Sequence, residues 1–417
     1  MKKSIVFLKE LNFLVLCTLM LNFAISFCRF MTMPFLIIYF SNNTNLEYQQ
    51  IGIIIGLSSL SSLLFALLAG RWTDKVGAKI ALPVSLIIPA VSFIGYLTTS
   101  NFYLLSIFSA VSGFSWAIYN SSNMTILAKF SNEKKEEVFG LNYWLFNLGA
   151  VLGPILGANL GAGDSQFVIY IFVITLILSS LALYFTFSRK KIEIDQSSNI
   201  DSQSFINTLG SLFSKKSIVY MLIAYFSLFY VQSQLETNVG LYLKDTFGEM
   251  GIKTFAYSLS LSAFVVLFFQ PLFILLLKKR KDISVFLLGT LLTIIGTTSY
   301  LFFDTPLLLL IPILLISLGE VVYTPKLQAL VANLAEDGSE ATYFSLLNMS
   351  GNLAFFIGPW SGALLIQQNS SLLFGAMTLV GIMGGGSMIL SYLAYKKKNT
   401  YSSNPNNFET MYENKVN

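Results

Sequence analysis

The chain is built from apolar runs that are each long enough to cross a lipid bilayer. A transmembrane helix needs about 20 such residues. Twelve runs of this kind lie at approximately residues 12–40, 49–72, 80–99, 103–128, 138–162, 166–188, 217–243, 254–277, 283–303, 305–334, 342–366 and 371–395. In hydrocarbon a helix satisfies all of its backbone hydrogen bonds internally. The sequence therefore predicts an all-α membrane protein with twelve transmembrane helices.

The scarcity of charge supports this prediction. Only 11% of the residues are charged, whereas soluble proteins carry about 25%. Lys2 and Lys3 in front of the first apolar run are also compatible with a cleaved signal peptide. That run continues to Phe40 without a small-residue cleavage site, and many more spans follow. We therefore interpret it as the first transmembrane helix.

Lysine and arginine are distributed unevenly between the two ends of the predicted spans. Of the 26 basic residues, 22 lie in the terminal segments and in the turns after spans two, four, six and eight. Lys244 and Lys253 lie in the opposite turns. The positive-inside rule then predicts that both termini and the middle loop are cytoplasmic. The same asymmetry accounts for the basic run 278–281, so a nucleic-acid partner is disfavoured.

The two halves of the sequence repeat one another. The pair Gly153-Pro154 recurs as Gly358-Pro359, an offset of 205 residues (358 − 153). The repeat predicts two pseudo-symmetric six-helix bundles. The predicted boundaries are 1–188 for the N-terminal half, 189–216 for a cytoplasmic linker, 217–398 for the C-terminal half and 399–417 for a cytoplasmic polar tail. Transporters built from such repeats bind substrate between the halves, near the membrane midplane.

Glycines recur every four residues in span five, at Gly149, Gly153, Gly157 and Gly161. They form one helix face without side chains, which a neighbouring backbone can approach closely. Two interpretations remain open. The stripe is either close helix packing alone, or a pivot between two halves that rock against each other.

Several motifs carry a family resemblance. The glycine motif consists of Gly140, Gly149, Gly153, Pro154 and Gly157, and the turn after span two contains Gly70, Asp74, Lys75, Gly77 and Lys79. Together with segments 138–144 and 318–325, these residues resemble the drug:proton antiporters of the major facilitator superfamily, in the branch of proton-coupled bacterial multidrug exporters. The resemblance implies a major facilitator fold in the bacterial cytoplasmic membrane. It also implies export of lipophilic, often cationic, drugs or antibiotics in exchange for protons, by alternating access.

The resemblance also implies a role for Asp74 and its loop as a latch that closes the cytoplasmic side. The alternative is that the basic residues of this loop serve only as a topology signal. The chain departs from the family pattern elsewhere. Ser109 stands where these exporters commonly have an arginine, and Asn142 and Ala128 stand where some relatives have carboxylates. Proton coupling by those positions is therefore not transferred to this chain.

Three charged residues lie inside predicted spans, namely Arg29, Glu236 and Glu320. Each costs about 2.5–3.5 kcal/mol at a helix centre, so such residues face the protein interior or a water-filled cavity. The chain has no histidine, and proton exchange near neutral pH then falls to the two glutamates. A structural ion pair between Arg29 and one glutamate is the alternative.

The surroundings of these charges indicate a binding cavity. Gln232 precedes Glu236 by one helical turn, so the two share a face, while Gln234 and Asn238 point elsewhere. Asn142 lies on the glycine stripe of span five, next to Tyr143. Aromatic rings with a few polar groups and a carboxylate suit a lipophilic cation. We expect Glu320, Glu236, Arg29, Gln232, Asn142 and Tyr143 to form the site for protons and substrate.

Other functions are less well supported. Cys17 and Cys28 lie about 16 Å apart on a helix, too far for a disulfide. No metal or cofactor motif occurs, no nucleotide-binding loop is present, and we do not expect an enzyme. The first alternative is a proton symporter for uptake of a nutrient or small peptide. A membrane receptor or assembly factor is a further alternative. The expected partners are a small lipophilic substrate, protons and the lipid bilayer, with the protein functional as a monomer.

Overall fold

A computed structural model describes residues 12–131, 134–188, 215–334 and 340–402. Regular structure in these ranges is helical. The N-terminal half contains α2 (Phe13–Thr32), η1 (Met33–Phe35), α3 (Leu36–Asn43), α4 (Tyr48–Val76), α5 (Ala78–Thr98), α6 (Phe102–Phe130), α7 (Lys135–Asn159) and α8 (Phe167–Ser188). The C-terminal half contains α10 (Lys216–Glu236), α11 (Asn238–Leu277), α12 (Asp282–Ser299), α13 (Leu310–Leu334), α14 (Glu340–Gln368) and α15 (Ser370–Ser402).

Eleven continuous helical stretches within the described ranges are long and apolar enough to cross a membrane, and one of them contains two spans. That stretch runs over 62 residues from Lys216 to Leu277, about three times the length that a bilayer needs. Its backbone leaves helical geometry at Gly248, where φ is 58° and ψ is −131°. A Cβ atom on Gly251 would collide with the carbonyl of Leu243, so the chain reverses here. The described residues thus contain the twelve spans that the sequence predicts.

Four local details complete the description of the spans. Pro34 lies within η1, which separates α2 from α3 inside the first span. Gly77 joins α4 directly to α5 with a φ of 88°, a conformation that L side chains rarely adopt. Residues 305–309, predicted as the start of span ten, form turns around Pro306, and α13 begins at Leu310. At the other end, α15 extends to Ser402, beyond the predicted boundary at 398.

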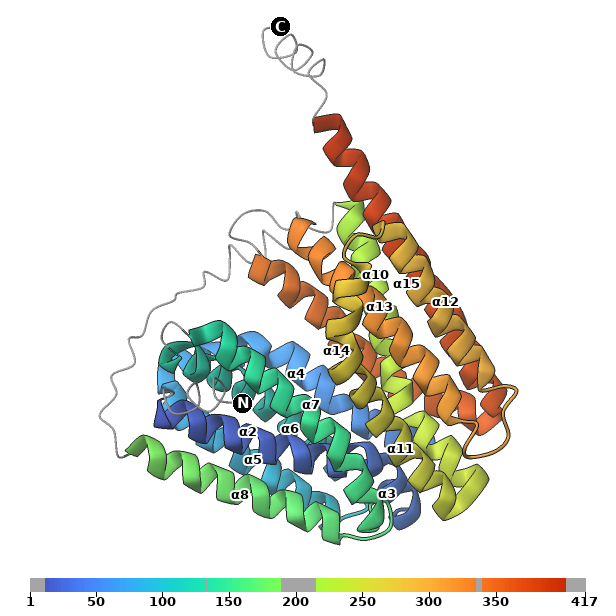
Figure 1. Ribbon diagram of the computed structural model, residues 1–417. Coiled ribbons are helices and arrows are strands. Elements are labelled where there is room, and N and C mark those ends of the chain that lie inside the picture. The colour runs from blue at the N-terminus through green and yellow to red at the C-terminus, as the bar shows by residue number, and fades with distance from the viewer. Residues whose placement is uncertain (1–11, 132–133, 189–214, 335–339, 403–417) are drawn as a thin grey trace, which may run out of the picture.

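The two six-helix halves converge at one end and diverge at the other (Figure 1). They are apart where α8 ends and α10 begins, and they meet near α3 and the middle of α11. The main contacts between the halves join α4 to α14 and α7 to α11. On α4, the Cβ positions of Gly52 and Gly56 lie 2.5 and 2.6 Å from backbone carbonyl oxygens of Pro359 and Phe356. The halves therefore touch backbone to backbone at this end.

Gly149, Gly153 and Gly157 of the glycine stripe pack within their own half. Gly161 was predicted on the same helix face, but it lies beyond the end of α7 at Asn159, with a φ of 82°. The Cβ position of Gly153 lies 2.7 Å from the carbonyl oxygen of Phe27 on α2, and Gly157 meets Met31. In the other half, Gly358 of α14 packs against Ser233 of α10. The two repeats thus use their glycines for the same purpose, which is close helix packing. A further role as a pivot stays a prediction.

Candidate functional site

A cavity of about 430 Å³ lies between the two halves. Its walls come from α2 and α7 on one side and from α10, α11, α13 and α14 on the other. The aromatic lining residues are Phe30, Tyr143, Phe146, Phe229 and Phe355, and the polar ones include Asn147, Gln232, Glu236, Ser262, Gln270, Glu320, Thr324 and Gln328. This composition can accept a lipophilic guest and orient it through a few polar groups.

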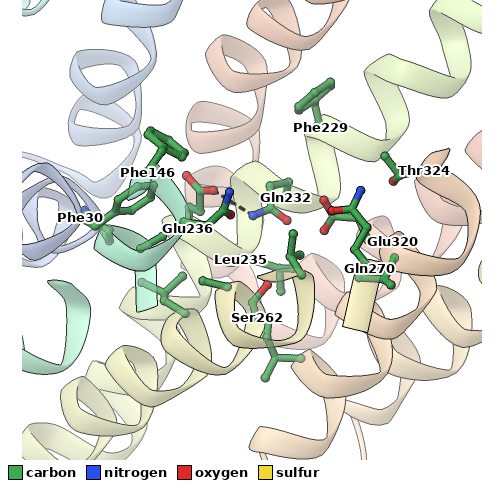
Figure 2. Close-up of a pocket in the computed structure, with 18 of the residues that line it drawn as sticks. Phe30, Phe146, Phe229, Gln232, Leu235, Glu236, Ser262, Gln270, Glu320 and Thr324 are labelled. Atoms are coloured by element: carbon green, nitrogen blue, oxygen red, sulfur yellow. Dashed lines mark hydrogen bonds between the residues drawn. The ribbon is translucent and has the colours of Figure 1, made fainter. Parts of the chain in front are cut away.

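Both intramembrane glutamates face this cavity (Figure 2). Gln232 Nε2 donates a 2.9 Å hydrogen bond to Glu236 Oε1, so these two side chains share one face of α10. Glu320 enters from α13, and Gln232 lies between the two carboxylates in this view. Two carboxylates from different helices therefore face one cavity. That space can hold a proton, a cation, or both in turn.

Arg29 lies outside this first cavity. Its guanidinium stacks on the ring of Trp116, with the Cζ atom 4.7 Å from the ring centroid. The described residues include no ion-pair partner for it within 4 Å. Arg29 and Glu236 do share a neighbouring cavity of about 380 Å³. Arg29 and Glu236 therefore face one cavity with opposite charges, and they do not form the direct ion pair that the sequence left open as an alternative.

Asn142 belongs to a polar network inside the N-terminal half. Asn22 Nδ2 donates to Asn142 Oδ1 at 2.8 Å and to Asn123 Oδ1 at 3.0 Å. Tyr119 donates its hydroxyl hydrogen to Asn22 Oδ1 at 2.7 Å. These residues, with Arg29, line a cavity of about 370 Å³. Asn22, Tyr119 and Asn123 are site residues that the sequence did not predict, although amide side chains inside apolar runs are a signal of a polar site.

Tyr143 lies where two of the cavities adjoin. Its hydroxyl on α7 donates to Gln270 Oε1 on α11 at 3.3 Å, which links the halves near the cavity. Tyr143 lines both the 430 Å³ and the 370 Å³ cavities, and Phe146 lines these two and the 380 Å³ cavity as well. The three cavities therefore meet around one turn of α7.

Gln234 and Asn238 point away from the cavity, as the sequence predicted for them. Both are fully buried against α14. Gln234 Nε2 donates to the carbonyl oxygen of Gly358 at 2.9 Å, and Asn238 Nδ2 donates to that of Pro359 at 3.2 Å. These amides donate hydrogen bonds to the backbone carbonyls of residues 358 and 359. Pro359 has no backbone N–H, so it cannot form the usual helical hydrogen bond to the carbonyl one turn earlier in α14. Their role is helix packing.

The residues of the expected latch lie at the end where the halves are apart. Asp74 and Lys75 are exposed, and Asp74 forms no hydrogen bond or ion pair with any residue that the structure describes. The Cβ positions of Gly70, Gly77 and Gly140 meet no atom within 4 Å. In this conformation Asp74 and these glycines therefore make no contact with the described part of the opposite half. At the departure noted in span four, the hydroxyl of Ser109 donates to the carbonyl of Ile54.

Comparisons with known proteins agree with this architecture. The family model of the Major Facilitator Superfamily matches residues 18–359 and 254–413. An uncharacterized MFS-type transporter, YqjV of Bacillus subtilis, is 26% identical, covering 88% of this chain and 89% of its own. The class H tetracycline resistance protein of Pasteurella multocida is 20% identical, with 84% and 87% covered. The multi-drug resistance efflux pump PmrA homolog of Lactococcus lactis is 25% identical, with 80% and 83% covered.

Solved structures share the fold at low sequence identity. A crystal structure of the peptide transporter POT in complex with sulfate has a TM-score of 0.73 and 14% identity, covering 93% of this chain and 94% of that chain. A crystal structure of the nucleoside transporter NupG has a TM-score of 0.70 and 13% identity, covering 92% and 98%. The architecture and the family match lead to one conclusion: the chain is a multi-pass membrane transporter and belongs to the major facilitator superfamily.

Proposed function

We propose that this transporter exports lipophilic, cationic compounds in exchange for protons. One observation carries the proposal, namely that Glu236 and Glu320 reach one aromatic-lined cavity between the halves from two different helices. A desolvated carboxylate attracts either a proton or an organic cation, and aromatic faces favour the same cations. Competition between proton and cation for these groups couples the two fluxes.

The conformation supports an alternating-access cycle. The halves meet at the end where α3 and the middle of α11 lie, and they diverge at the end where α8 ends and α10 begins (Figure 1). With the orientation that the positive-inside rule predicts, the divergent end faces the cytoplasm. The cavity then loads substrate from the cytoplasmic side, and closure of that side with opening of the other releases it outside. We assign proton carriage to Glu320 and cation recognition to Glu236.

The related transporters support export more than uptake. Two relatives along most of the chain are a tetracycline resistance protein and a multidrug efflux pump homolog by name. The alternative is uptake of a nutrient or peptide with protons. The alternative is supported by the peptide and nucleoside transporters that share the fold. We propose the bacterial cytoplasmic membrane as the location and the monomer as the functional unit.

Transport in everted membrane vesicles tests the direction and the coupling. Vesicles carrying the protein are energised with an imposed pH gradient, acid inside, and a fluorescent lipophilic cation such as ethidium is added outside. We expect accumulation of ethidium that stops when nigericin dissipates the pH gradient. Accumulation in right-side-out vesicles alone, driven by external acid, would instead establish uptake.

A further inference from the structure

Arg29 is a half-buried cation whose guanidinium forms no hydrogen bond or close ion pair with the residues that the structure describes. It lies in α2, in the middle of the first span, and its one described side-chain contact is the face of Trp116. Hydrogen bonds and ion pairs to its guanidinium are absent from the described part of the chain. A guanidinium carries five N–H donors, and a charge taken out of water is normally paired. The structure therefore leaves an unused anion-binding group beside the transport cavity.

The surroundings of Arg29 also offer donors. Trp116 is 4% exposed, and its indole Nε1 is buried without a hydrogen-bond partner among the described residues. Both residues line the 370 Å³ cavity together with Asn22, Asn120, Asn123 and Asn142. No carboxylate lines this cavity. A guanidinium is a donor only, so Arg29 suits a group that accepts hydrogen bonds and carries negative charge.

The opposite charge lies across the adjoining cavity. Arg29 and Glu236 both line the space of about 380 Å³, yet they are not within ion-pair distance. Phe30, Phe146 and Phe355 line the same space. A single molecule in this space can thus meet a cation, a carboxylate and aromatic rings.

We infer that the substrates include lipophilic zwitterions, whose carboxylate binds Arg29 while their ammonium group binds at Glu236. This inference rests on the proposed export function and narrows its substrate class. Arg29 favours a carboxylate because a guanidinium and a carboxylate match in shape and can form two parallel hydrogen bonds. The phosphate of a lipid headgroup can bind a guanidinium in a similar way, and the experiment below distinguishes a lipid from a zwitterionic substrate.

Three probes that differ in charge test the inference by direct binding. Norfloxacin carries both a carboxylate and an ammonium group, its ethyl ester carries only the ammonium group, and nalidixic acid carries only the carboxylate. Their Kd values are measured by fluorescence on the purified full-length protein in phosphatidylcholine nanodiscs. We expect norfloxacin to bind at least about tenfold more tightly than its ester, as a charge-assisted hydrogen-bonded pair implies.

Variants assign the two ends of the ligand. Arg29→Gln is expected to remove the preference for norfloxacin while leaving the Kd of the ester within about twofold. Arg29→Lys is expected to keep part of the preference, since it keeps the charge but not the paired geometry. Glu236→Gln is expected to weaken both probes that bear an ammonium group and to spare nalidixic acid. Arg280→Gln changes an exposed arginine in the turn before α12 and serves as the matched control.

Several results would overturn the inference. One is equal affinity of the wild-type protein for norfloxacin and its ester, which needs no variant to fold. Another is an equal loss of affinity for norfloxacin and for its ester in Arg29→Gln, which would show that Arg29 has a structural role. A third is displacement of norfloxacin by phosphatidylglycerol from the wild-type protein but not from Arg29→Gln. This result would show that the site at Arg29 binds a lipid phosphate. If the protein still binds and exports the ester in any of these cases, the proposed export of cations is retained and only the inference about zwitterions is rejected.

Discussion

Tyr48 on α4 donates a 2.8 Å hydrogen bond to Asp245 Oδ2 on α11, and this bond joins the two halves at the end where they converge. Lys244 forms a 3.3 Å ion pair with Asp245 and donates a 3.3 Å hydrogen bond to Ser41 of α3. These polar contacts lie beside the backbone contacts at Gly52. In the proposed cycle they must break each time the cavity opens to the outside.

Removing the Tyr48 hydroxyl should favour the outward-open state. Tyr48→Phe deletes one hydrogen bond to a charged group, which is worth about 1.5–3 kcal/mol, so the population ratio should shift by roughly tenfold or more. Spin labels placed on α4 and α11 at this end report the distance between the halves. Tyr103→Phe is the control, because Tyr103 is 74% exposed at the start of α6. Identical distance distributions in both variants would show that the bond does not hold this end closed.

A large side chain in the glycine stripe should impair transport through local packing. In Gly153→Leu the added Cβ lies 2.7 Å from the Phe27 carbonyl oxygen and 2.9 Å from the Met31 nitrogen. Overpacking of this kind costs about 1–3 kcal/mol, so we expect a lower melting temperature and slower efflux. Gly375→Leu is the control, since its Cβ position has no atom within 4 Å. Wild-type stability of Gly153→Leu would contradict the packing between α7 and α2.

The latch hypothesis predicts a kinetic defect in Asp74→Asn. The carboxylate of Asp74 is exposed and without a described partner in this conformation, so the substitution should leave folding unchanged. If Asp74 stabilises the closed cytoplasmic side, by about 0.3–1 kcal/mol at a helix N-terminus, exchange should slow in both directions. Efflux and counterflow rates are measured at matched protein levels. Unchanged rates would leave only the topology signal as the role of this loop.

The predicted orientation has its own test. A reporter fused after Lys191 should be cytoplasmic, and one inserted in residues 41–48 should be external. Alkaline phosphatase and green fluorescent protein fusions distinguish the two sides, since the first is active outside and the second inside. An active phosphatase after Lys191 would reverse the orientation and with it the proposed direction of transport.

Features that depend on local sequence were predictable. The spans follow from hydropathy, and the shared face of Gln232 and Glu236 follows from their spacing of one helical turn. The network of Asn22 with Tyr119 and Asn123 was not, because its members are 97 and 101 residues apart in sequence. The same holds for Gly52, whose close neighbour lies on α14. Such contacts depend on how helices pack, and a single helical pattern does not encode that packing.

The central claim is that Glu236 and Glu320 couple proton movement to substrate movement. Glutamine keeps the size and polarity of the side chain but cannot ionise. We expect Glu320→Gln to lose uphill transport driven by a pH gradient while keeping downhill exchange. We expect Glu236→Gln mainly to weaken cationic substrates and to spare neutral ones.

The most direct measurement is transport of a lipophilic cation by the double variant in proteoliposomes. The imposed driving force is a pH gradient alone and then a membrane voltage alone. Our account predicts that Glu236→Gln with Glu320→Gln no longer concentrates the cation under the pH gradient, while the wild-type protein does. Concentration of the cation by the double variant under the pH gradient would show that the proton path does not use these carboxylates, and would contradict the mechanism.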